Sequence, residues 1–267
     1  MRGDGILTAS RLSTALGYRP FRFRMTTEST NDLAREWALE GAENGAVVVA
    51  EEQTVGRGRF GRAWVAPGGT ALLFSVIYRH TLPRERVLRY TMVGAVSVRA
   101  AIAAIPGINT SDVTLKWAND VQLGGRKVCG ILPEAIWEGN TLQAVIIGIG
   151  VNVRINFAGT DLADKATSIE QHTTHNVDRA QWLAKVLEVL DMWAARANEL
   201  SLFLTWRSAL STLGQHVAAA SVSIPGRMTV GRAVDVDDDG ALIIRDDKGR
   251  VHRVISGEVT LQTDSST

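Results

Sequence analysis

Residues 56–64, with the sequence GRGRFGRAW, constrain this chain more than any other segment. The first seven of them contain three Gly, three Arg and no acidic residue. Glycines let a backbone turn sharply and approach a ligand closely, and guanidinium groups offer paired donors that match carboxylate and phosphate oxygens. Trp64 adds a flat ring on which a base can stack. The segment therefore predicts a loop that binds a planar group attached to anions, such as a nucleotide.

Residues 56–61 also match the dinucleotide-binding pattern G-x-G-x-x-G, which has to follow a strand and begin a helix. The apolar residues 46–50 predict the strand, but Pro67 and the β-rich residues 72–78 follow where a helix is needed. We therefore do not expect a Rossmann fold, and the missing Gly-Lys-Ser/Thr ending excludes an ordinary P-loop. A basic surface loop and a patch for nucleic-acid backbone remain as alternatives.

Charge and cysteine content narrow the classes of function. The 267 residues include 29 basic and 28 acidic ones, for a net charge of +1, so any anion site has to be local. The single cysteine, Cys129, excludes an intramolecular disulfide and indicates a reducing compartment, and its apolar neighbours predict a core residue. No apolar stretch is long enough to cross a membrane, and no signal peptide is recognised. We expect a soluble cytoplasmic protein.

Periodicity along the chain predicts a large α+β domain over residues 1–213. Ser29, followed by Asp32, is typical of a capped helix start, and Gly41 of its end. The expected helices and strands are a short helix or arm within 1–20, a strand at 21–25, a helix from about 29, strands at 46–53 and 70–79, a helix at 86–105, a three-stranded antiparallel meander of 113–117, 127–137 and 141–153, an irregular segment at 154–177, and helices from 178 to about 210.

From residue 214 the pattern changes to short strands separated by turns. These predict a small β-barrel domain over residues 214–267. The acidic run at 237–239 is interpreted as a solvated turn and not as a metal site. The expected strands are 217–222, 229–236, 241–245, 251–255 and 259–262, with turns at Pro225-Gly226, 237–240 and 246–249.

Four motifs stand in order along the chain: Ser29-Thr30-Asn31; Gln53 with GRGRFGRAW; KWANDV (116–121) with KVCGILPE (127–134); and GIGVNV (148–153). Their order and spacing resemble those of the biotin protein ligases, the biotin–acetyl-CoA-carboxylase ligase family. The resemblance covers nearly the whole chain, and the Arg/Gly loop together with KW-x-ND-V is highly specific. It implies a fold related to class II aminoacyl-tRNA synthetases, with a mixed or antiparallel sheet flanked by helices, and an SH3-like C-terminal β-barrel.

The resemblance implies an ATP-dependent ligase that works in two steps. The biotin carboxylate attacks the α-phosphate of ATP to give biotinyl-5′-AMP and pyrophosphate, and a lysine of a biotin carboxyl carrier domain then takes the acyl group. Biotin and ATP are the implied substrates, and Mg²⁺ is expected to accompany ATP without a dedicated set of protein ligands. A carboxylase of the acetyl-CoA carboxylase type is the implied partner. A monomer or weak homodimer, and no nucleic-acid or membrane partner, are expected.

The resemblance also implies the site residues. Biotin-binding residues would be Ser29, Thr30, Asn31, Gln53, Arg57, Gly58, Arg59, Lys127 and Gly130. ATP-binding residues would be Arg57, Arg62, Trp64, Lys116, Asn119 and Asn152. Catalytic residues would be Arg59, Lys127 and Asp120, with Asp120 orienting the acceptor lysine, and no metal ligand is implied. These residue types fit the adenylation of biotin. Joining two anions needs cations to screen their repulsion, and a urea-like ring needs paired hydrogen-bond donors and acceptors.

The chain departs from the family pattern at three points. Ala118 stands where many members have Pro, and Pro133 lies within a predicted strand, which favours an edge position or a bulge. The winged-helix domain of the dual-function members is not recognised, so a ligase without repressor function is expected. Two rival functions remain: a lipoate or octanoate ligase or transferase on the same scaffold, and a nucleic-acid-binding module.

Overall fold

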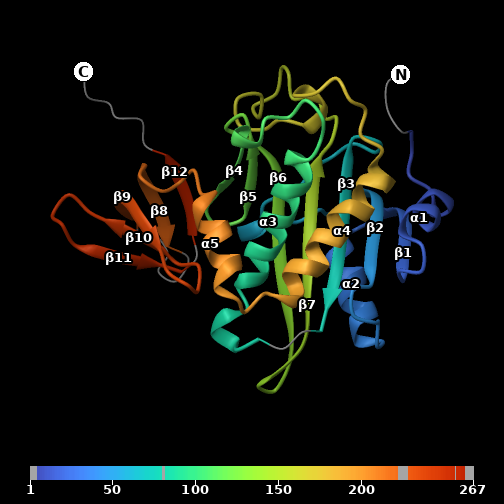
Figure 1. Ribbon diagram of the computed structural model, residues 1–267, viewed down its shortest axis with the longest axis horizontal. Coiled ribbons are helices and arrows are strands. Elements are labelled where there is room, and N and C mark those ends of the chain that lie inside the picture. Colours follow the sequence, from blue (N-terminus) through green and yellow to red (C-terminus); the bar gives the residue numbers. More distant parts are fainter. Residues whose placement is uncertain (1–4, 80–81, 222–227, 256, 262–267) are drawn as a thin grey trace.

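The computed structural model describes residues 5–79, 82–221, 228–255 and 257–261. Two sheets organise them, a seven-stranded mixed sheet and a separate five-stranded antiparallel sheet. Figure 1 shows helices packed against the larger sheet, with the smaller sheet beside it at the C-terminal end of the chain. The α+β class expected from the sequence is confirmed.

The larger sheet has the strand order β1-β2-β3-β7-β6-β5-β4. β1 and β2 run parallel because helix α2 (Thr30–Leu39) connects them, and the other neighbouring strands are antiparallel. The strands are β1 (Phe21–Thr27), β2 (Val47–Gln53), β3 (Ala71–Tyr78), β4 (Val113–Lys116), β5 (Asp120–Leu123), β6 (Arg126–Glu138) and β7 (Thr141–Asn152).

Strand register brings the four motifs together near one end of the strands of this sheet. Thr27, at the end of β1, pairs with Gln53 at the end of β2, and Asn152 at the end of β7 pairs with Ala71 at the start of β3. On the other side of β7, the first residue of β5 pairs with Gly130 of β6 and with the last residue of β4. The loops that leave these strand ends therefore converge, although the motifs lie far apart in the sequence.

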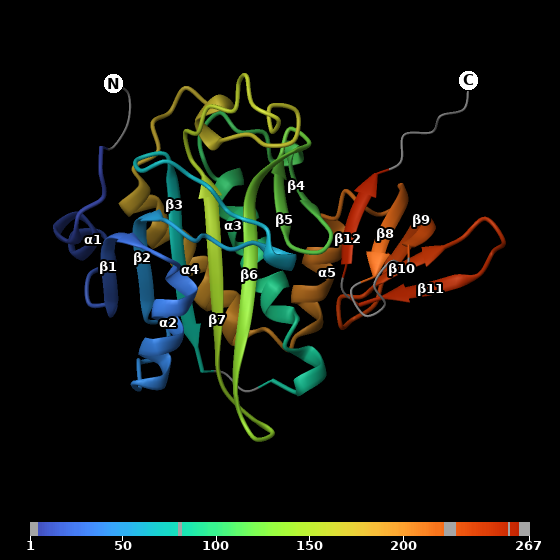
Figure 2. The same cartoon turned by 180° about the vertical axis from the view of Figure 1, so that it is seen from behind.

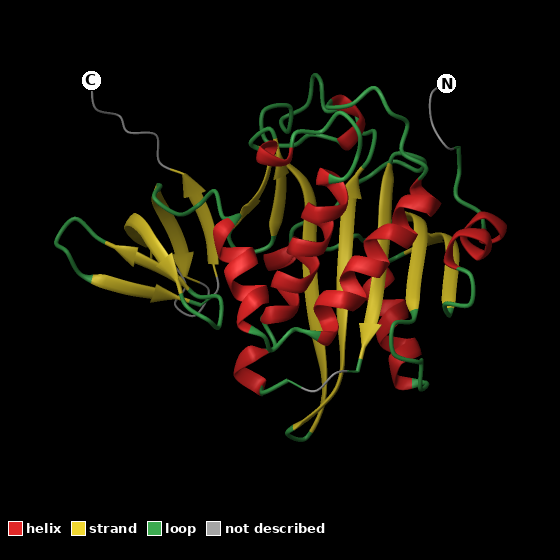
Figure 3. Cartoon of the chain, in the orientation of Figure 1, coloured by secondary structure: helices red, strands yellow, loops and turns green. Residues whose placement is uncertain are grey.

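Helices cover both faces of the larger sheet, because side chains along a strand alternate between its two sides. Val47 and Val49 of β2 join the core that contains the apolar faces of α3 and α4, whereas Val48 packs with Ala34 and Ala38 of α2. Figures 1 and 3 show α3, α4 and α5 on one face, and Figure 2 shows α2 on the other. The remaining helices are α1 (Ala9–Leu16), α3 (Arg89–Ala103), α4 (Arg179–Ala195) and α5 (Leu200–Ser208).

The smaller sheet has the order β11-β10-β9-β8-β12, with antiparallel neighbours. Its strands are β8 (His216–Ser221), β9 (Met228–Val236), β10 (Leu242–Arg245), β11 (Val251–Val254) and β12 (Gly257–Leu261). The five short strands expected from the sequence are confirmed, and the turns at 237–240 and 246–249 are closed by backbone hydrogen bonds. The expected Pro225-Gly226 turn and residues 222 and 262 lie outside the described residues.

The turn between β9 and β10 holds the smaller sheet against the larger domain. The buried Arg89 at the start of α3 donates from Nε to the carbonyl oxygen of Asp238 at 3.1 Å. The indole Nε1 of Trp117 donates to the carbonyl oxygen of Gly240 at 2.8 Å. Because buried donors need acceptors, these two bonds fix the turn beside the connection between β4 and β5.

The predicted meander has one strand more than expected. Residues 120–123 form β5, which pairs with both β4 and β6, and Gly124-Gly125 is the turn between β5 and β6. The three-strand prediction was wrong because a four-residue strand carries too few alternating positions to be recognised.

Three other local predictions can be compared with the fold. Pro133 lies at an edge position, because the pairing of β5 with β6 ends at Gly130 and Pro133 faces only β7. A 3₁₀ turn, Arg59–Gly61, and then β3 follow β2, so the exclusion of a Rossmann fold is confirmed. The helix expected at 86–105 begins later, at Arg89, after another 3₁₀ turn.

Candidate active site

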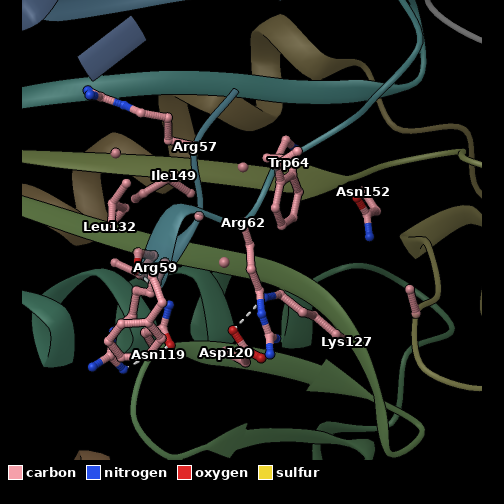
Figure 4. Close-up of a pocket in the computed structure, with 18 of the residues that line it drawn as sticks. Arg57, Arg59, Arg62, Trp64, Asn119, Asp120, Lys127, Leu132, Ile149 and Asn152 are labelled. Carbon is pink, nitrogen blue, oxygen red and sulfur yellow. Dashed lines mark hydrogen bonds and ion pairs between the residues drawn. The ribbon is translucent and has the colours of Figure 1, made fainter. Parts of the chain in front are cut away.

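A pocket of about 420 Å³ lies where the strand ends meet (Figure 4). Its walls come from the loop after β2, the connection between β4 and β5, strands β6 and β7, and residues of the segment 157–166; β12 contributes Gly257 and Val259. A volume of this size suits a small-molecule ligand. All of the site residues predicted from the sequence line it: Ser29, Thr30, Asn31, Gln53, Arg57, Gly58, Arg59, Arg62, Trp64, Lys116, Asn119, Asp120, Lys127, Gly130 and Asn152.

The Arg/Gly loop, residues 56–64, forms a narrow hairpin along the pocket. The backbone N–H of Trp64 donates to the carbonyl oxygen of Gly56 at 2.8 Å. A Cβ at position 56 would lie 2.3 Å from the carbonyl oxygen of Trp64, so only glycine fits there. Phe60 has φ +60°, a left-handed conformation that costs a non-glycine residue about 1–2 kcal/mol. Close backbone approach therefore explains part of the glycine content of this loop.

Three glycines of β6 and β7 form the floor of the pocket. A Cβ on Gly148 would lie 2.2 Å from Oδ1 of Asn31. A Cβ on Gly150 would lie 2.7 Å from Cε2 of Trp64, and one on Gly130 would lie 3.1 Å from Cζ3 of the same ring. Glycine in a strand marks a close approach, and here it lets an amide and an indole lie directly on the sheet.

At one end of the pocket, here called the uncharged end, the lining residues Thr30, Asn31 and Gln53 belong to a hydrogen-bond network that Ser75 and the Glu134 carboxylate complete from behind. Gln53 Oε1 accepts from the backbone N–H of Thr30 at 2.7 Å and from its hydroxyl at 3.0 Å. The hydroxyl of Ser75 on β3 lies 2.8 Å from Thr30 Oγ1 and 2.7 Å from Asn31 Oδ1. Asn31 Nδ2 donates to Glu134 Oε1 at 2.8 Å. The network ties the start of α2 to β2, β3 and β6.

The start of α2 differs from the capping box expected for Ser29 and Asp32. Ser29 occupies the N-cap position and is buried, but its side chain makes no capping hydrogen bond. Gln53 instead satisfies the N–H of Thr30, and Asp32 forms an ion pair with Arg57 of the Arg/Gly loop. The helix start predicted at Ser29 is confirmed, and a tertiary contact rather than the Ser29 side chain supplies the acceptor.

Arg57 and Glu134 join the uncharged end to the Arg/Gly loop. Arg57 Nη2 lies 3.3 Å from Glu134 Oε1, and Arg35 Nη2 donates to Glu134 Oε2 at 2.8 Å. Burial acts to raise the pKa of Glu134, but hydrogen bonds from Arg35 and Asn31 and the charge of Arg57 outweigh it, so the pKa is lowered. Glu134 is therefore ionised at neutral pH and can only accept.

The opposite end of the pocket carries positive side chains beside acceptors. Lys127 Nζ lies 2.6 Å from Asp120 Oδ1 and 5.6 Å from the centroid of the Trp64 ring. Arg59 donates to Asn119 Oδ1 at 3.3 Å. Burial lowers the pKa of Arg59, and the charge of Asp120 opposes that shift. In Figure 4 Arg57 points to the side of the pocket opposite Lys127 and Asp120.

The residues expected to bind the nucleotide lie around Trp64. Its Nε1 is buried and has no hydrogen-bond partner within the described part of the chain. Asn152 is buried at the end of β7, where its Nδ2 donates to the carbonyl oxygen of Thr167 at 3.1 Å. Arg62 is exposed on the loop, and Lys116 is half-buried at the end of β4. These positions would allow contact with a base and its phosphates.

Two further predictions concern Cys129 and metals. Cys129 is fully buried in β6, and burial raises the pKa of its thiol, so it is a core residue as expected. Across residues 5–79, 82–221, 228–255 and 257–261, His, Cys, Asp and Glu side chains form no group of three or more that could hold a metal ion. The helices described there include none that is long and apolar enough to cross a membrane.

Four residues at the site were not predicted as site residues from the sequence: Ser75, Glu134, Gly148 and Gly150. Each nevertheless carried a signal. Ser75 is a hydroxyl residue within the apolar stretch 72–77, and Glu134 ends the KVCGILPE motif. Gly148 and Gly150 alternate within an apolar strand, as expected where another group approaches the backbone. The partners of these residues lie too far away in sequence to be deduced.

Comparison with known protein families identifies the class to which this fold and pocket belong. The sequence profile of the Biotin/lipoate A/B protein ligase family matches residues 23–152, and that of the Biotin protein ligase C terminal domain matches residues 212–261. The first match covers the Arg/Gly loop and all of the larger sheet except the first two residues of β1.

Individual relatives narrow this class. The chain is 32% identical over 241 residues to the bifunctional ligase/repressor BirA of Bacillus subtilis, covering 87% of this chain and 71% of that protein. It is 32% identical over 230 residues to the biotin–[acetyl-CoA-carboxylase] ligase of Paracoccus denitrificans, covering 84% and 93%. The structure of the Aquifex aeolicus biotin protein ligase in complex with biotin and ATP is similar, with a TM-score of 0.74, 28% identity and coverage of 92% and 99%. The chain belongs to the biotin protein ligase family.

Proposed function

We propose that this protein is a ligase that activates biotin with ATP and transfers it to a lysine of a biotin carboxyl carrier domain in a carboxylase of the acetyl-CoA carboxylase type. One observation carries the proposal. One pocket holds the amide and hydroxyl groups of Thr30, Asn31 and Gln53 at one end and Lys127 and Arg59 at the other. Each residue expected for this reaction lines it. Biotin has the matching form, with a neutral ureido ring and a carboxylate.

The positive end is suited to the first step, in which the biotin carboxylate displaces pyrophosphate from ATP. Two anions have to approach, so their repulsion and the charge developing on phosphorus need preorganised cations. We assign Lys127 to the carboxylate and acyl-phosphate oxygens, and Arg59 and Arg62 to the phosphates. Lys116 and Asn119 lie at the same end and would contact the phosphates as well.

The uncharged end is suited to the ureido ring and the valeryl chain. We assign Ser29, Thr30, Asn31 and Gln53 to the ring, because hydroxyl and amide side chains offer both donors and acceptors. Arg57 and Gly58 would close over the acid, and Gly130 would permit close backbone approach.

Trp64 and Asn152 are assigned to the adenine. Lys127 lies within 5.6 Å of the Trp64 ring centroid, so the base and the reacting oxygens would share this part of the pocket.

Asp120 is assigned to the second step, in which the acceptor lysine attacks the acyl-adenylate and AMP leaves. Its carboxylate lies 2.6 Å from Lys127 Nζ, which supports a role in holding an ammonium or amine. Mg²⁺ would enter with ATP and be held chiefly by its phosphates, because the described residues form no carboxylate cluster for it.

We further propose that residues 1–213 form the catalytic domain, related to class II aminoacyl-tRNA synthetases, and that residues 214–267 form an SH3-like barrel. The five-stranded antiparallel sheet supports the latter. The buried free thiol of Cys129 fits the reducing cytoplasm. A monomer or weak homodimer that binds no nucleic acid is the expected state, and ligase activity without repressor function stays a prediction.

The decisive experiment is biotin-dependent exchange of labelled pyrophosphate into ATP, with lipoate as the matched acid. Exchange with biotin but not lipoate is expected. Exchange with lipoate alone would indicate the related lipoate ligase activity. With neither acid active, oligonucleotide binding that weakens steeply with salt would indicate a nucleic-acid-binding module. Transfer is then tested with a carrier domain, using its Lys→Arg variant at the acceptor position as control.

A further inference from the structure

We propose that Ser75 and Glu134 are positioning residues that set the hydrogen-bond polarity of the uncharged end of the pocket, so that it accepts a cyclic urea and rejects a ring without hydrogen-bonding groups. The inference rests on the ligase function proposed above and deepens it. Neither residue is assigned a contact with biotin. Both act through Asn31 and, beyond it, through Thr30 and Gln53.

Ser75 fixes the oxygen end of the Asn31 amide. All eight residues of β3 are buried, and the Ser75 hydroxyl is 0% exposed. Its single proton can reach Asn31 Oδ1 at 2.7 Å or Thr30 Oγ1 at 2.8 Å. The carbonyl oxygen of Asn31 can only accept, whereas the Thr30 hydroxyl carries a proton of its own and can donate it to Gln53 Oε1. Asn31 Oδ1 therefore depends on the Ser75 proton, and Thr30 Oγ1 does not.

Glu134 fixes the nitrogen end of the same amide. Its carboxylate can only accept when ionised, and hydrogen bonds from Arg35 and Asn31 keep its pKa below the ordinary value against the effect of burial. Asn31 Nδ2 uses its two protons on Glu134 Oε1 at 2.8 Å and on the carbonyl oxygen of Leu132 at 3.2 Å. If the Asn31 amide were flipped, its oxygen would face the Glu134 carboxylate, and two acceptors would meet without a proton. Ser75 and Glu134 together therefore permit only one orientation of the amide.

The side chains beside the fixed Asn31 amide offer donors to a ligand. Gln53 Oε1 already accepts from the backbone N–H of Thr30 at 2.7 Å, so the Nε2 donors of Gln53 remain for a ligand. The Ser29 hydroxyl, which lines the pocket, makes no capping bond and can donate to a ligand as well. A urea carbonyl is a strong acceptor for such donors, whereas the dithiolane ring of lipoate has no comparable group. A site built on buried hydrogen bonds rejects a ring that leaves them unpaired.

The first test is Ser75→Ala, with Ser97→Ala as the matched control. Ser97 is also a fully buried serine, on α3, but it has no hydrogen-bond partner within the described residues. In the pyrophosphate-exchange assay Ser75→Ala is expected to raise KM for biotin about ten-fold or more, because Asn31 Oδ1 loses its donor. KM for ATP should change less than about two-fold, and Ser97→Ala should change neither KM by more than that.

The second test is a double-mutant cycle with Glu134→Gln, which retains the shape of the side chain. Both substitutions act on one amide, so the rise in KM for biotin in Ser75→Ala/Glu134→Gln should be clearly smaller than the product of the single effects. The Ser97→Ala/Glu134→Gln pair should give the simple product. The biotin-to-lipoate preference should fall in each variant that carries Ser75→Ala.

The outcomes separate this inference from the function beneath it. Wild-type protein without biotin-dependent exchange would contradict the proposed function. Normal wild-type exchange with an unchanged biotin KM in Ser75→Ala would overturn the positioning role alone. Equal rises in the KM for biotin and ATP, together with a lower Tm than in Ser97→Ala, would show that Ser75 is only structural and would also overturn it.

Discussion

The two ends of the pocket hold their polar groups in different ways. At the uncharged end, Asn31 is 3% exposed and Ser75 is 0% exposed, and both amide protons of Asn31 are used within the protein. At the charged end, Lys127 and Asp120 pair while their side chains are 35% and 23% exposed. The Arg57–Asp32 pair, which links the Arg/Gly loop to the start of α2, is more open still. The buried neutral groups are therefore held in place before a ligand binds, whereas a ligand anion can replace the acidic partner in the exposed ion pairs.

Physical chemistry explains why the ends differ. A buried amide or hydroxyl without a partner costs about 1–3 kcal/mol, so neutral groups that recognise a ring need fixed partners. Partly exposed ion pairs contribute only about 0–1 kcal/mol, so a carboxylate or phosphate can replace an internal acid at little cost. We therefore expect substitutions at the uncharged end to change the affinity for biotin. Substitutions in the ion pairs should change the rate of adenylate formation or the competition between internal acids and ligand anions for the cations.

The largest effect is expected from Lys127→Ala at the charged end. Removing a preorganised cation from developing negative charge lowers rates by about 100- to 1000-fold, and biotin-dependent pyrophosphate exchange should fall by that amount. Far-UV circular dichroism and Tm should stay close to wild type. Lys185→Ala, on the exposed side of α4, is the control and should retain full exchange. Full exchange in Lys127→Ala would remove its assigned role.

Gly148→Ala should have the next largest effect, at the uncharged end. The added Cβ would lie 2.2 Å from Asn31 Oδ1, so Asn31 has to move and its network is broken. The dissociation constant for biotin, measured by calorimetry, should rise about 10- to 100-fold. Gly68→Ala is the control, because its nearest atoms would lie 4.0 Å away. Similar biotin binding by both variants would show that the network is less rigid than the comparison requires.

Asp32→Asn should have a smaller effect in the opposite direction. The Asp32 carboxylate competes with a ligand anion for Arg57, and a half-exposed ion pair is worth up to about 1 kcal/mol. KM for biotin should therefore fall about two- to five-fold with little change in kcat. Asp161→Asn, in an exposed turn, is the control. A higher KM for biotin in Asp32→Asn would mean that Asp32 holds the loop in its active form.

The smallest effect is a pH dependence of stability that arises from Glu134. Its pKa is lowered in the folded protein, so its contribution is present above the ordinary Glu pKa and is lost as pH falls through the lowered value. The difference in free energy of unfolding between wild type and Glu134→Gln should shrink from about pH 5 to about pH 3 in urea titrations. Glu138→Gln, exposed at the end of β6, is the matched control. A difference in free energy of unfolding that stays constant between about pH 5 and about pH 3 would contradict the lowered pKa of Glu134.

Much of the fold was predictable because it depends on local pattern. Apolar runs identified β2, β3 and β7, and the Pro106-Gly107 signal identified the end of α3. The short β5 was not identified, since four residues do not establish a period. The start of α2 at Ser29 was predicted, but the acceptor for the Thr30 N–H comes from Gln53 on β2, and the sequence does not show that contact.

The sequence by itself determined the chemistry of this protein. Three arginines and three glycines in one loop, with the motifs that follow, specify anion binding and close backbone approach, and these properties belong to residue types and spacing. Only the tertiary structure decided which groups meet. Register across β3, β7 and β6 places Ser75, Asn31 and Glu134 in contact, although more than 40 residues separate Asn31 from either partner. Hydrogen-bond polarity depends on geometry over a few ångströms, and chain folding sets that geometry.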